Sequence, residues 1–162
     1  MGAAAVVRAV FEEYGFTWDE AEYCADLYDL EGAYLAQGNY FWVAEADGRL
    51  IGTCGLELFS RLPGEIQQKV QIEGKVRAAG ADCSLERLYV HPASRGIGVG
   101  SALISTCIET ARRLGRTAME IWSDKKLTNA HKMYGLYGAH EIGDRICDDP
   151  DESPEWGFVI PL

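Results

Sequence analysis

The sequence predicts an α/β (α+β) three-layer sandwich, in which helices flank a mixed, mostly antiparallel central sheet. The first observation is the order of periodic segments: helix, helix, hairpin, strand, helix, strand, helix and two strands. The second is the length of 162 residues with 48% hydrophobic residues, which suits one domain over residues 1–162. The third is a strand that passes through a glycine-rich loop into a helix between Leu85 and Gly115.

The first third of the chain is predicted to hold two helices and a hairpin. Residues 3–14 and 19–36 carry apolar side chains at helical spacing, with a short break between them. Residues 39–46 and 49–58 flank Asp47-Gly48, a dipeptide that favours the type I′ turn of a hairpin.

Residues 60–82 are longer than a turn between neighbouring strands. The spacing of their apolar residues predicts an inserted helix that is interrupted at Gly74, with a solvated surface insertion as the alternative. The C-terminal part is predicted to contain a strand over 117–123, a helix over 125–137 and strands over 139–147 and 155–162.

The strand, loop and helix around residue 95 organise the prediction of function. Leu85–Val90 reads as a strand that His91-Pro92 must end, because proline has no N–H to donate. Apolar residues recur at helical spacing from Val99, and Gly115 is placed to end that helix. The alternate glycines between them let the backbone approach a ligand at a helix N-terminus, where a phosphate is favoured.

Two well-known phosphate loops fit this segment poorly. A Walker A loop needs Gly-Lys-Ser/Thr, and Ser101 is not preceded by a lysine. A dinucleotide fingerprint would use Gly96 and Gly98, with Glu120 as its acidic residue, but Ser101 stands where a glycine or alanine is required. The dinucleotide alternative is therefore kept only as a distant one.

A third pattern, Arg/Gln-x-x-Gly-x-Gly/Ala, is met by Arg95, Gly98 and Gly100. Together with the preceding LYVHP strand and the helix that contains AHKMY and ends near Gly138, it makes the chain resemble the GNAT superfamily of N-acetyltransferases, from about residue 38 to the C-terminus. That superfamily opens with a strand before its first helix. Here the helix begins almost at Met1, which leaves open whether the strand is truncated or absent.

The resemblance implies a GNAT-like fold and direct transfer of an acetyl group from acetyl-CoA, the cosubstrate, to a primary amine of a small molecule or protein. Backbone groups of the strand would pair with pantetheine, and the loop would bind the pyrophosphate. The implied acetyl-CoA contacts are Leu88, Tyr89, Val90, Arg95, Gly96, Ile97, Gly98, Val99, Gly100, Ser101 and Asn129.

Two residues are implied to be catalytic. Tyr134 matches the helix tyrosine that hydrogen-bonds the CoA sulfur and protonates the leaving thiolate, although Leu127 stands where that helix often has an asparagine. Glu86 lies where some members place a general base, and alternation puts it on the same face as Leu88 and Val90. Packing is the alternative for Tyr134, and an ion-paired or surface position is the alternative for Glu86. The other candidate bases are His91, His131 and His140.

Composition limits the partners. The net charge of −10 disfavours nucleic acid and anionic membranes, and no apolar run approaches the length of a membrane span. Five cysteines without a C-x-x-C motif indicate reduced thiols and no metal site. Because the sequence also shows no secretory signal, a cytoplasmic protein is expected, and a homodimer is left open. The acidic residues over 148–152 indicate a cationic acceptor, and an ordinary solvated turn is the alternative explanation for them.

A non-catalytic acyl-CoA-binding domain is the alternative function of the chain.

Overall fold

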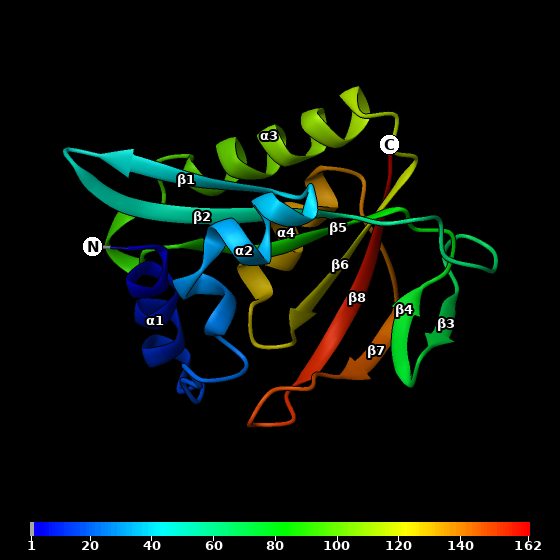
Figure 1. The fold of residues 1–162 in the computed structure, drawn as a ribbon, viewed down its shortest axis with the longest axis horizontal. Coiled ribbons are helices and arrows are strands. Elements are labelled where there is room, and N and C mark those ends of the chain that lie inside the picture. Colours follow the sequence, from blue (N-terminus) through cyan, green and yellow to red (C-terminus); the bar gives the residue numbers. More distant parts are fainter. Residues whose placement is uncertain (1) are drawn as a thin grey trace. The chain divides into compact units, whose positions relative to one another are not determined.

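The computed structural model describes residues 2–162 (Figure 1). These residues divide into two compact units. Of the described residues, the first unit comprises 2–57 and Leu85–Glu109, and the second comprises Leu58–Ser84 and Thr110–Leu162. The first contains α1 (Ala3–Tyr14), η1 (Ala25–Tyr28), α2 (Leu30–Ala33), η2 (Leu35–Gln37), β1 (Tyr40–Ala46), β2 (Arg49–Leu58), η3 (Pro92–Ser94) and most of β5 (Cys83–Val90) and α3 (Val99–Arg113). The second contains β3 (Lys69–Ile72), β4 (Lys75–Ala78), β6 (Ala118–Asp124), α4 (Thr128–Leu136), β7 (His140–Ile146) and β8 (Pro154–Pro161).

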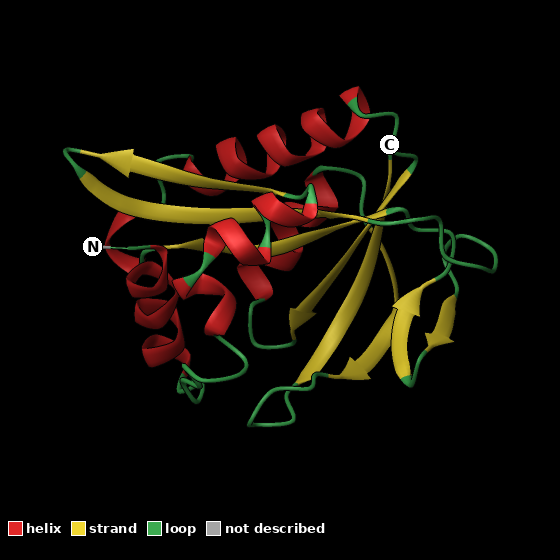
Figure 2. Ribbon diagram, in the orientation of Figure 1, coloured by secondary structure: helices red, strands yellow, loops and turns green. Residues whose placement is uncertain are grey.

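Six of the strands in residues 2–162 form one sheet, in the order β1-β2-β5-β6-β8-β7, and β3 and β4 form a sheet of their own (Figure 2). The pairs β1–β2, β6–β8 and β7–β8 are antiparallel. The pair β5–β6 is parallel, through Cys83 opposite Met119 and Ser84 opposite Glu120. The predicted fold class, with a mixed and mostly antiparallel sheet, is therefore confirmed.

The first helix and the first hairpin follow their predicted boundaries closely. Helix α1 ends at Gly15, whose φ of 74° lies in the left-handed region and whose N–H donates to the Phe11 carbonyl. Strands β1 and β2 meet at Asp47 and Gly48, with φ values of 51° and 71°. Two consecutive positive φ values are what a type I′ turn requires, so the turn chemistry of Asp-Gly explains the hairpin.

Residues 19–36 do not form the predicted continuous helix, and that prediction is wrong. They fold into turns and the short elements η1, α2 and η2. The Asp19 carboxylate accepts the N–H of Glu22 at 3.1 Å, and the Asp29 carboxylate accepts the N–H of Gly32 at 2.9 Å. These side-chain acceptors replace backbone carbonyls as hydrogen-bond partners, which favours separate turns over one long helix.

The inserted helix predicted within 60–82 is also wrong, because this segment contains the β3–β4 hairpin. Its turn residues Glu73 and Gly74 have φ values of 51° and 79°, the same pair of left-handed conformations as in the first hairpin. Lys69 Nζ donates to the Asp144 carbonyl at 2.9 Å, and Arg145 Nη1 donates to the Val76 carbonyl at 2.8 Å. Within the second unit these bonds attach the hairpin to β7.

Each unit has an apolar core. In the first unit, partly exposed aromatic rings pack around buried residues of α1 and of the segment after it. The buried residues are Val7, Phe11, Cys24 and Leu27, and the rings are those of Phe16, Trp18, Tyr23, Phe41 and Tyr89. In the second unit, small and branched side chains pack together: Ala78, Ala81, Ala118 and Val159, with Phe59 and Ile142. Cys54, Cys83 and Cys107 are also fully buried, where a thiol packs as a small apolar side chain.

Candidate active site

The glycine-rich loop leads from η3 into α3, as the motif predicts. Gly96 and Gly98 have φ values of 81° and 87°, a region that L-residues with a side chain rarely adopt. A Cβ placed on either glycine would have no heavy atom within 4 Å, so the loop has open space beside its backbone. The Ala102 N–H donates to the Gly98 carbonyl at 3.0 Å, which makes the loop the direct start of the helix. A phosphate fits such a cradle, because a helix N-terminus and nearby backbone amides favour anions.

The N-terminal end of α3 is held close to β2. A Cβ on Gly52 would lie 2.8 Å from Leu103 Cδ1 and 2.9 Å from Val99 Cγ1, so any larger residue would require these side chains to shift. Figure 1 shows α3 running alongside the β1–β2 hairpin. Close packing of α3 on β2 therefore positions the loop relative to the rest of the first unit.

Arg95 is partly exposed and forms an ion pair that the motif does not predict. Its Nη1 donates to both carboxylate oxygens of Glu13 on α1, at 2.6 and 2.9 Å. The side chains of Arg95 and Glu13 are 39% and 35% exposed, so water screens the pair. A guanidinium has five N–H donors, and those of Nε and Nη2 are not used in this pair.

The strand segment predicted to pair with pantetheine forms the end of β5. Leu88, Tyr89 and Val90 are half-buried, and the strand ends before His91, whose N–H donates to the Ile51 carbonyl at 2.8 Å. The ring of Tyr89 packs against Phe11 with a centroid distance of 5.9 Å. The segment is thus anchored to β2 and to the core of the first unit.

Arg87, on the same strand, is a residue that sequence reasoning missed. Its φ is 48°, and its guanidinium is paired with Asp26. This backbone conformation interrupts the alternation from which Glu86 was assigned to the face of Leu88 and Val90. The signal in the sequence is an arginine inside an apolar strand, but a partner 61 positions away cannot be located from spacing.

Glu86 is half-buried and lies close to β2. A Cβ on Gly55 would lie 3.3 Å from Glu86 Cβ, so the root of the Glu86 side chain faces Gly55. Its carboxylate is near enough to the hydroxyl of Tyr34 to contribute to that group's raised pKa, which is due first to burial and then to Asp26. Glu86 is therefore neither a fully exposed nor a fully buried carboxylate.

Tyr134 lies on α4 in the second unit and is 3% exposed. Its ring meets Phe158 edge-on, with centroids 5.6 Å apart, and the His131 ring lies 6.2 Å away. His131 Nε2 is 3.1 Å from Ser123 Oγ. Burial lowers the pKa of His131, against the opposing influence of Asp124 and Glu141. A tyrosine in this setting has a fixed ring, which both packing and catalysis require.

The other predicted residues have distinct surroundings. Asn129 is exposed on the first turn of α4, and His140 is exposed on β7. His91 Nδ1 accepts the Ala93 N–H at 3.1 Å and so caps η3, which gives this histidine a structural role.

Glu120 does not have the position that a dinucleotide-binding domain requires. It is 2% exposed and accepts hydrogen bonds from Arg77 Nε at 2.7 Å, the Ala78 N–H at 2.9 Å and Trp122 Nε1 at 3.2 Å. Its lone pairs are used inside the second unit. This carboxylate therefore serves the fold and is not directed at a ribose.

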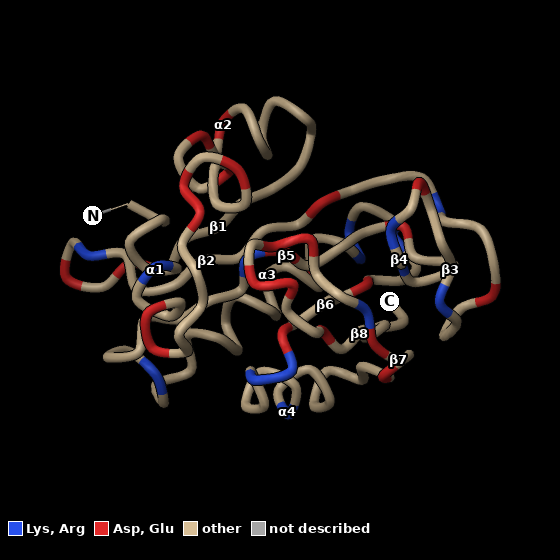
Figure 3. The backbone as a smooth tube through the Cα atoms, turned by 90° about the horizontal axis from the view of Figure 1, so that it is seen from below, with Lys and Arg blue, Asp and Glu red and all other residues tan. Residues whose placement is uncertain are grey.

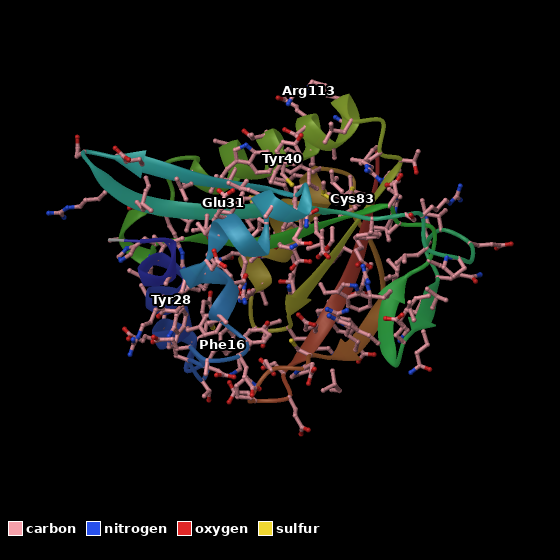
Figure 4. The ribbon with its side chains drawn as sticks, viewed as in Figure 1. Phe16, Tyr28, Glu31, Tyr40, Cys83 and Arg113 are labelled. Carbon is pink, nitrogen blue, oxygen red and sulfur yellow. The ribbon has the colours of Figure 1, made fainter. Side chains whose placement is uncertain are left out.

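Aromatic side chains of α1 and of the segment that follows it pack against one another in the first unit. Trp18 meets Phe11 edge-on at 5.4 Å, and Tyr14 stacks on Phe16 at 5.7 Å. Tyr28 differs because it is 52% exposed, and Figure 4 shows it with Phe16 beside α1. Tyr28 is thus more accessible to solvent than Tyr14 and Trp18.

Acidic residues recur in two segments. Figure 3 shows them around α2, where the sequence has Asp19, Glu20, Glu22, Asp26, Asp29 and Glu31. The loop between β7 and β8 holds Asp148, Asp149, Asp151 and Glu152. Asp149 accepts the Ser153 N–H at 2.8 Å and the Ser153 hydroxyl at 2.7 Å, so this member of the loop supports a turn.

Residues 2–162 show neither a cluster of metal-ligating side chains nor a helix suited to cross a membrane. No three His, Cys, Asp or Glu side chains there are grouped so that they could hold a metal ion. Every helix there is too short or too polar to cross a bilayer.

The chain was compared with known proteins. Residues 6–138 match the family described as "Acetyltransferase (GNAT) family". The uncharacterized N-acetyltransferase YjgM of Escherichia coli (strain K12) is 28% identical over 141 residues, which are 86% of this chain and 75% of that protein. Further relatives are longer, and the chain spans half or less of each.

Solved structures show the same fold. An acetyltransferase from Streptococcus agalactiae 2603 aligns with a TM-score of 0.73 at 19% identity, over 99% of this chain and 92% of that one. The structure of yncA, a putative acetyltransferase from Salmonella typhimurium with its cofactor acetyl-CoA, aligns with a TM-score of 0.66 at 18% identity, over 99% and 88% of the two chains. Since the family match covers most of the sequence and the fold agrees, the chain belongs to the GNAT family of acetyltransferases.

Proposed function

We propose that this protein is an acetyl-CoA-dependent N-acetyltransferase that transfers the acetyl group directly to a primary amine. The observation that carries the proposal is the loop from Arg95 into α3, where Gly96 and Gly98 have left-handed conformations and leave open space at the N-terminus of the helix. Acetyl-CoA supplies an activated thioester. The protein has to bind and orient it, remove a proton from the amine and donate a proton to the leaving thiolate.

We assign binding of acetyl-CoA to two neighbouring segments of the first unit. The backbone amides from Arg95 to Ser101 bind the pyrophosphate, and Arg95 adds a positive charge through its remaining N–H donors. The backbone N–H and C=O groups of Leu88–Val90 pair with the pantetheine arm, and one N–H polarises the thioester carbonyl. Asn129 on α4 is assigned as a further polar contact.

We assign the proton transfers to Tyr134 and Glu86. The Tyr134 phenol donates a proton to the sulfur as the thiolate leaves, which a buried tyrosine with a fixed ring can do if its hydroxyl is near the sulfur. The Glu86 carboxylate accepts the proton of the attacking amine, directly or through a water molecule. The half-buried position of Glu86 supports this role, since a carboxylate there is shielded without being inaccessible.

We infer a cationic amine acceptor and a cytoplasmic location. The net charge of −10 and the exposed acidic residues of the β7–β8 loop favour encounter with a positively charged molecule. The five free cysteines and the use of acetyl-CoA support a reducing compartment.

A panel of amines tests the function. The purified protein is incubated with acetyl-CoA and, in turn, polyamines, amino acids and peptides with free N-terminal or lysine amines, while released CoA thiol is measured. The expected result is CoA release that depends on one class of primary amine, with the acetylated product identified by mass spectrometry. The N,N-dimethylated form of the best acceptor is the control and should give no release. Tight acetyl-CoA binding without acceptor-dependent release would instead favour a non-catalytic acyl-CoA-binding domain.

A further inference from the structure

Arg87 has an unusual backbone conformation for a residue within a strand. Its φ of 48° lies in the left-handed region, which arginine adopts only when its surroundings impose it. Leu88–Val90 follow directly and are the residues assigned above to the pantetheine arm. The interactions that hold Arg87 therefore also decide where the N–H and C=O groups of these three residues point.

Both ends of Arg87 are held. Its carbonyl accepts the hydroxyl of the fully buried Thr53 at 2.7 Å. Its guanidinium binds the Asp26 carboxylate through two bonds, Nη2 to Oδ1 at 2.8 Å and Nε to Oδ2 at 3.1 Å. Nη2 also donates to the Tyr23 carbonyl, and the guanidinium carbon lies 4.9 Å from the centroid of the Tyr23 ring. A planar, two-bond pair of this kind fixes orientation as well as charge.

The pair lies in a shielded environment and extends to a third residue. The side chains of Arg87 and Asp26 are 10% and 24% exposed. Asp26 Oδ2 also accepts the Tyr34 hydroxyl at 2.8 Å, and the Tyr34 ring packs against Phe41 of β1 with centroids 4.9 Å apart. Burial alone lowers the pKa of Arg87, but the hydrogen bond with Asp26 and the neighbouring groups raise it overall.

The network connects two parts of the first unit that are far apart in sequence. Tyr23, Asp26 and Tyr34 belong to the segment around η1 and α2, which passes over β5 in Figure 1. Arg87 is thus the link between that segment and the strand end.

We propose that Arg87 is a positioning residue for acetyl transfer: its two-bond pair with Asp26 holds the left-handed backbone of β5 and thereby aims the backbone groups of Leu88–Val90 at the thioester. This inference rests on the proposed function. The pyrophosphate loop is a separate segment with its own support, so loss of the pair should impair the chemical step more than acetyl-CoA binding.

Three variants test the proposal with the full chain. Arg87→Lys keeps the charge and loses the two-bond geometry, and Asp26→Asn keeps the shape and loses the charge. Arg87→Gly removes the side chain while making a positive φ easy to adopt. With the acceptor found in the amine panel, each should lower kcat about ten- to hundredfold, as small misplacement of reacting groups does. The dissociation constant of acetyl-CoA, measured by calorimetry, should change less than about threefold.

Glu155→Gln is the matched control, because the pair of Arg145 with Glu155 is also shielded, with side chains 10% and 9% exposed, and has no assigned role in the reaction. It should lower the melting temperature but leave kcat unchanged below that temperature. Hydrogen–deuterium exchange without any ligand adds a readout that does not depend on turnover. Amides of Leu88–Val90 should exchange faster in Asp26→Asn and at the wild-type rate in Glu155→Gln.

The outcomes separate this inference from the function on which it rests. In one outcome, the wild-type protein transfers acetyl groups and the folded Asp26→Asn and Arg87→Gly variants do so equally fast. That result would overturn the proposed positioning role of Arg87. Equal losses of kcat in Asp26→Asn and Glu155→Gln would also overturn it, by showing a general effect of stability. A wild-type protein with no acceptor-dependent turnover would instead refute the proposed function.

Discussion

Tyr134 illustrates at the scale of one residue how packing and chemistry can share a side chain. Its ring is almost fully buried and meets Phe158 edge-on, so removal of the hydroxyl should leave the ring in place. Tyr134→Phe is expected to lower kcat about a hundredfold, because the departing thiolate loses its proton donor. The dissociation constant of acetyl-CoA should stay nearly unchanged, since the proton matters only in the transition state.

Steady-state kinetics and calorimetry check this prediction. Tyr137→Phe, the same chemical change three residues later, is the control and should keep the wild-type kcat. Wild-type turnover in Tyr134→Phe would make Tyr134 a packing residue.

His131 gives a prediction about pH and stability. Burial lowers its pKa below the ordinary value of 6.5, so the folded protein prefers the neutral ring. The unfolded chain then binds more protons between the lowered pKa and 6.5, and the free energy of unfolding rises with pH in that window. The contribution of the neutral His131 ring to the free energy of unfolding is complete above pH 6.5. It is lost as the pH falls through the lower pKa of His131 in the folded protein.

Urea unfolding at about pH 5.5 and pH 7.5 measures this effect. His131→Gln should reduce the difference in unfolding free energy between the two pH values. An undiminished difference in His131→Gln would place the titration elsewhere.

At the scale of the element, the loop between η3 and α3 depends on backbone conformation. Gly98→Val should lower acetyl-CoA affinity about tenfold or more, because a branched side chain opposes the positive φ and occupies the space beside the backbone. Wild-type protein should gain about 2.7 kcal/mol of stability at a hundred times the dissociation constant, and the variant should gain much less.

Thermal unfolding with and without acetyl-CoA tests this expectation. Gly115→Val is the control, since Gly115 also has a positive φ with open space around it but lies just beyond the other end of α3. Equal stabilisation of wild type and Gly98→Val by acetyl-CoA would refute the assignment of the loop.

Elements also show what the sequence alone can predict. The hairpin at Asp47-Gly48 was predictable because this dipeptide has a strong turn preference, whereas Glu73 gives no such signal and the β3–β4 hairpin was mistaken for a helix. The segment over 19–36 has real helical periodicity, but Asp19 and Asp29 bond to the backbone and divide it.

The residues of the candidate site also differ in whether the sequence alone can predict them. The loop residues could be named from a motif, since the required arginine and glycines lie close together in the sequence. Arg87 could not, because its left-handed backbone and its pairing with Asp26 depend on contacts between distant segments. Glu13 was missed as a partner of Arg95 for the same reason.

At the scale of the whole molecule, charge is the property that bears on the acceptor. The net charge of −10 should assist encounter with a cation, but exposed charges are screened over about 8 to 10 Å at physiological salt. Neutralising Asp148, Asp151 and Glu152 together should raise the KM of a cationic acceptor about two- to fivefold at low ionic strength and hardly at all in high salt. Asp149 is kept in this variant because it holds Ser153.

The KM of the triple variant at several salt concentrations shows whether the acidic loop attracts a cationic acceptor. A KM equal to that of the wild type at every concentration would mean that the loop is an ordinary turn, and it would remove the loop's support for a cationic acceptor.

Direct transfer from acetyl-CoA to an amine is the central claim, and rapid-quench mass spectrometry with labelled acetyl-CoA tests it most directly. The protein is preloaded with the labelled thioester, mixed with the acceptor and quenched at successive times. Direct transfer predicts that labelled amide and free CoA appear together in equal amounts and that no labelled protein forms at any time. An acetylated protein that forms and decays as fast as product appears, or CoA release without labelled amide, would contradict it.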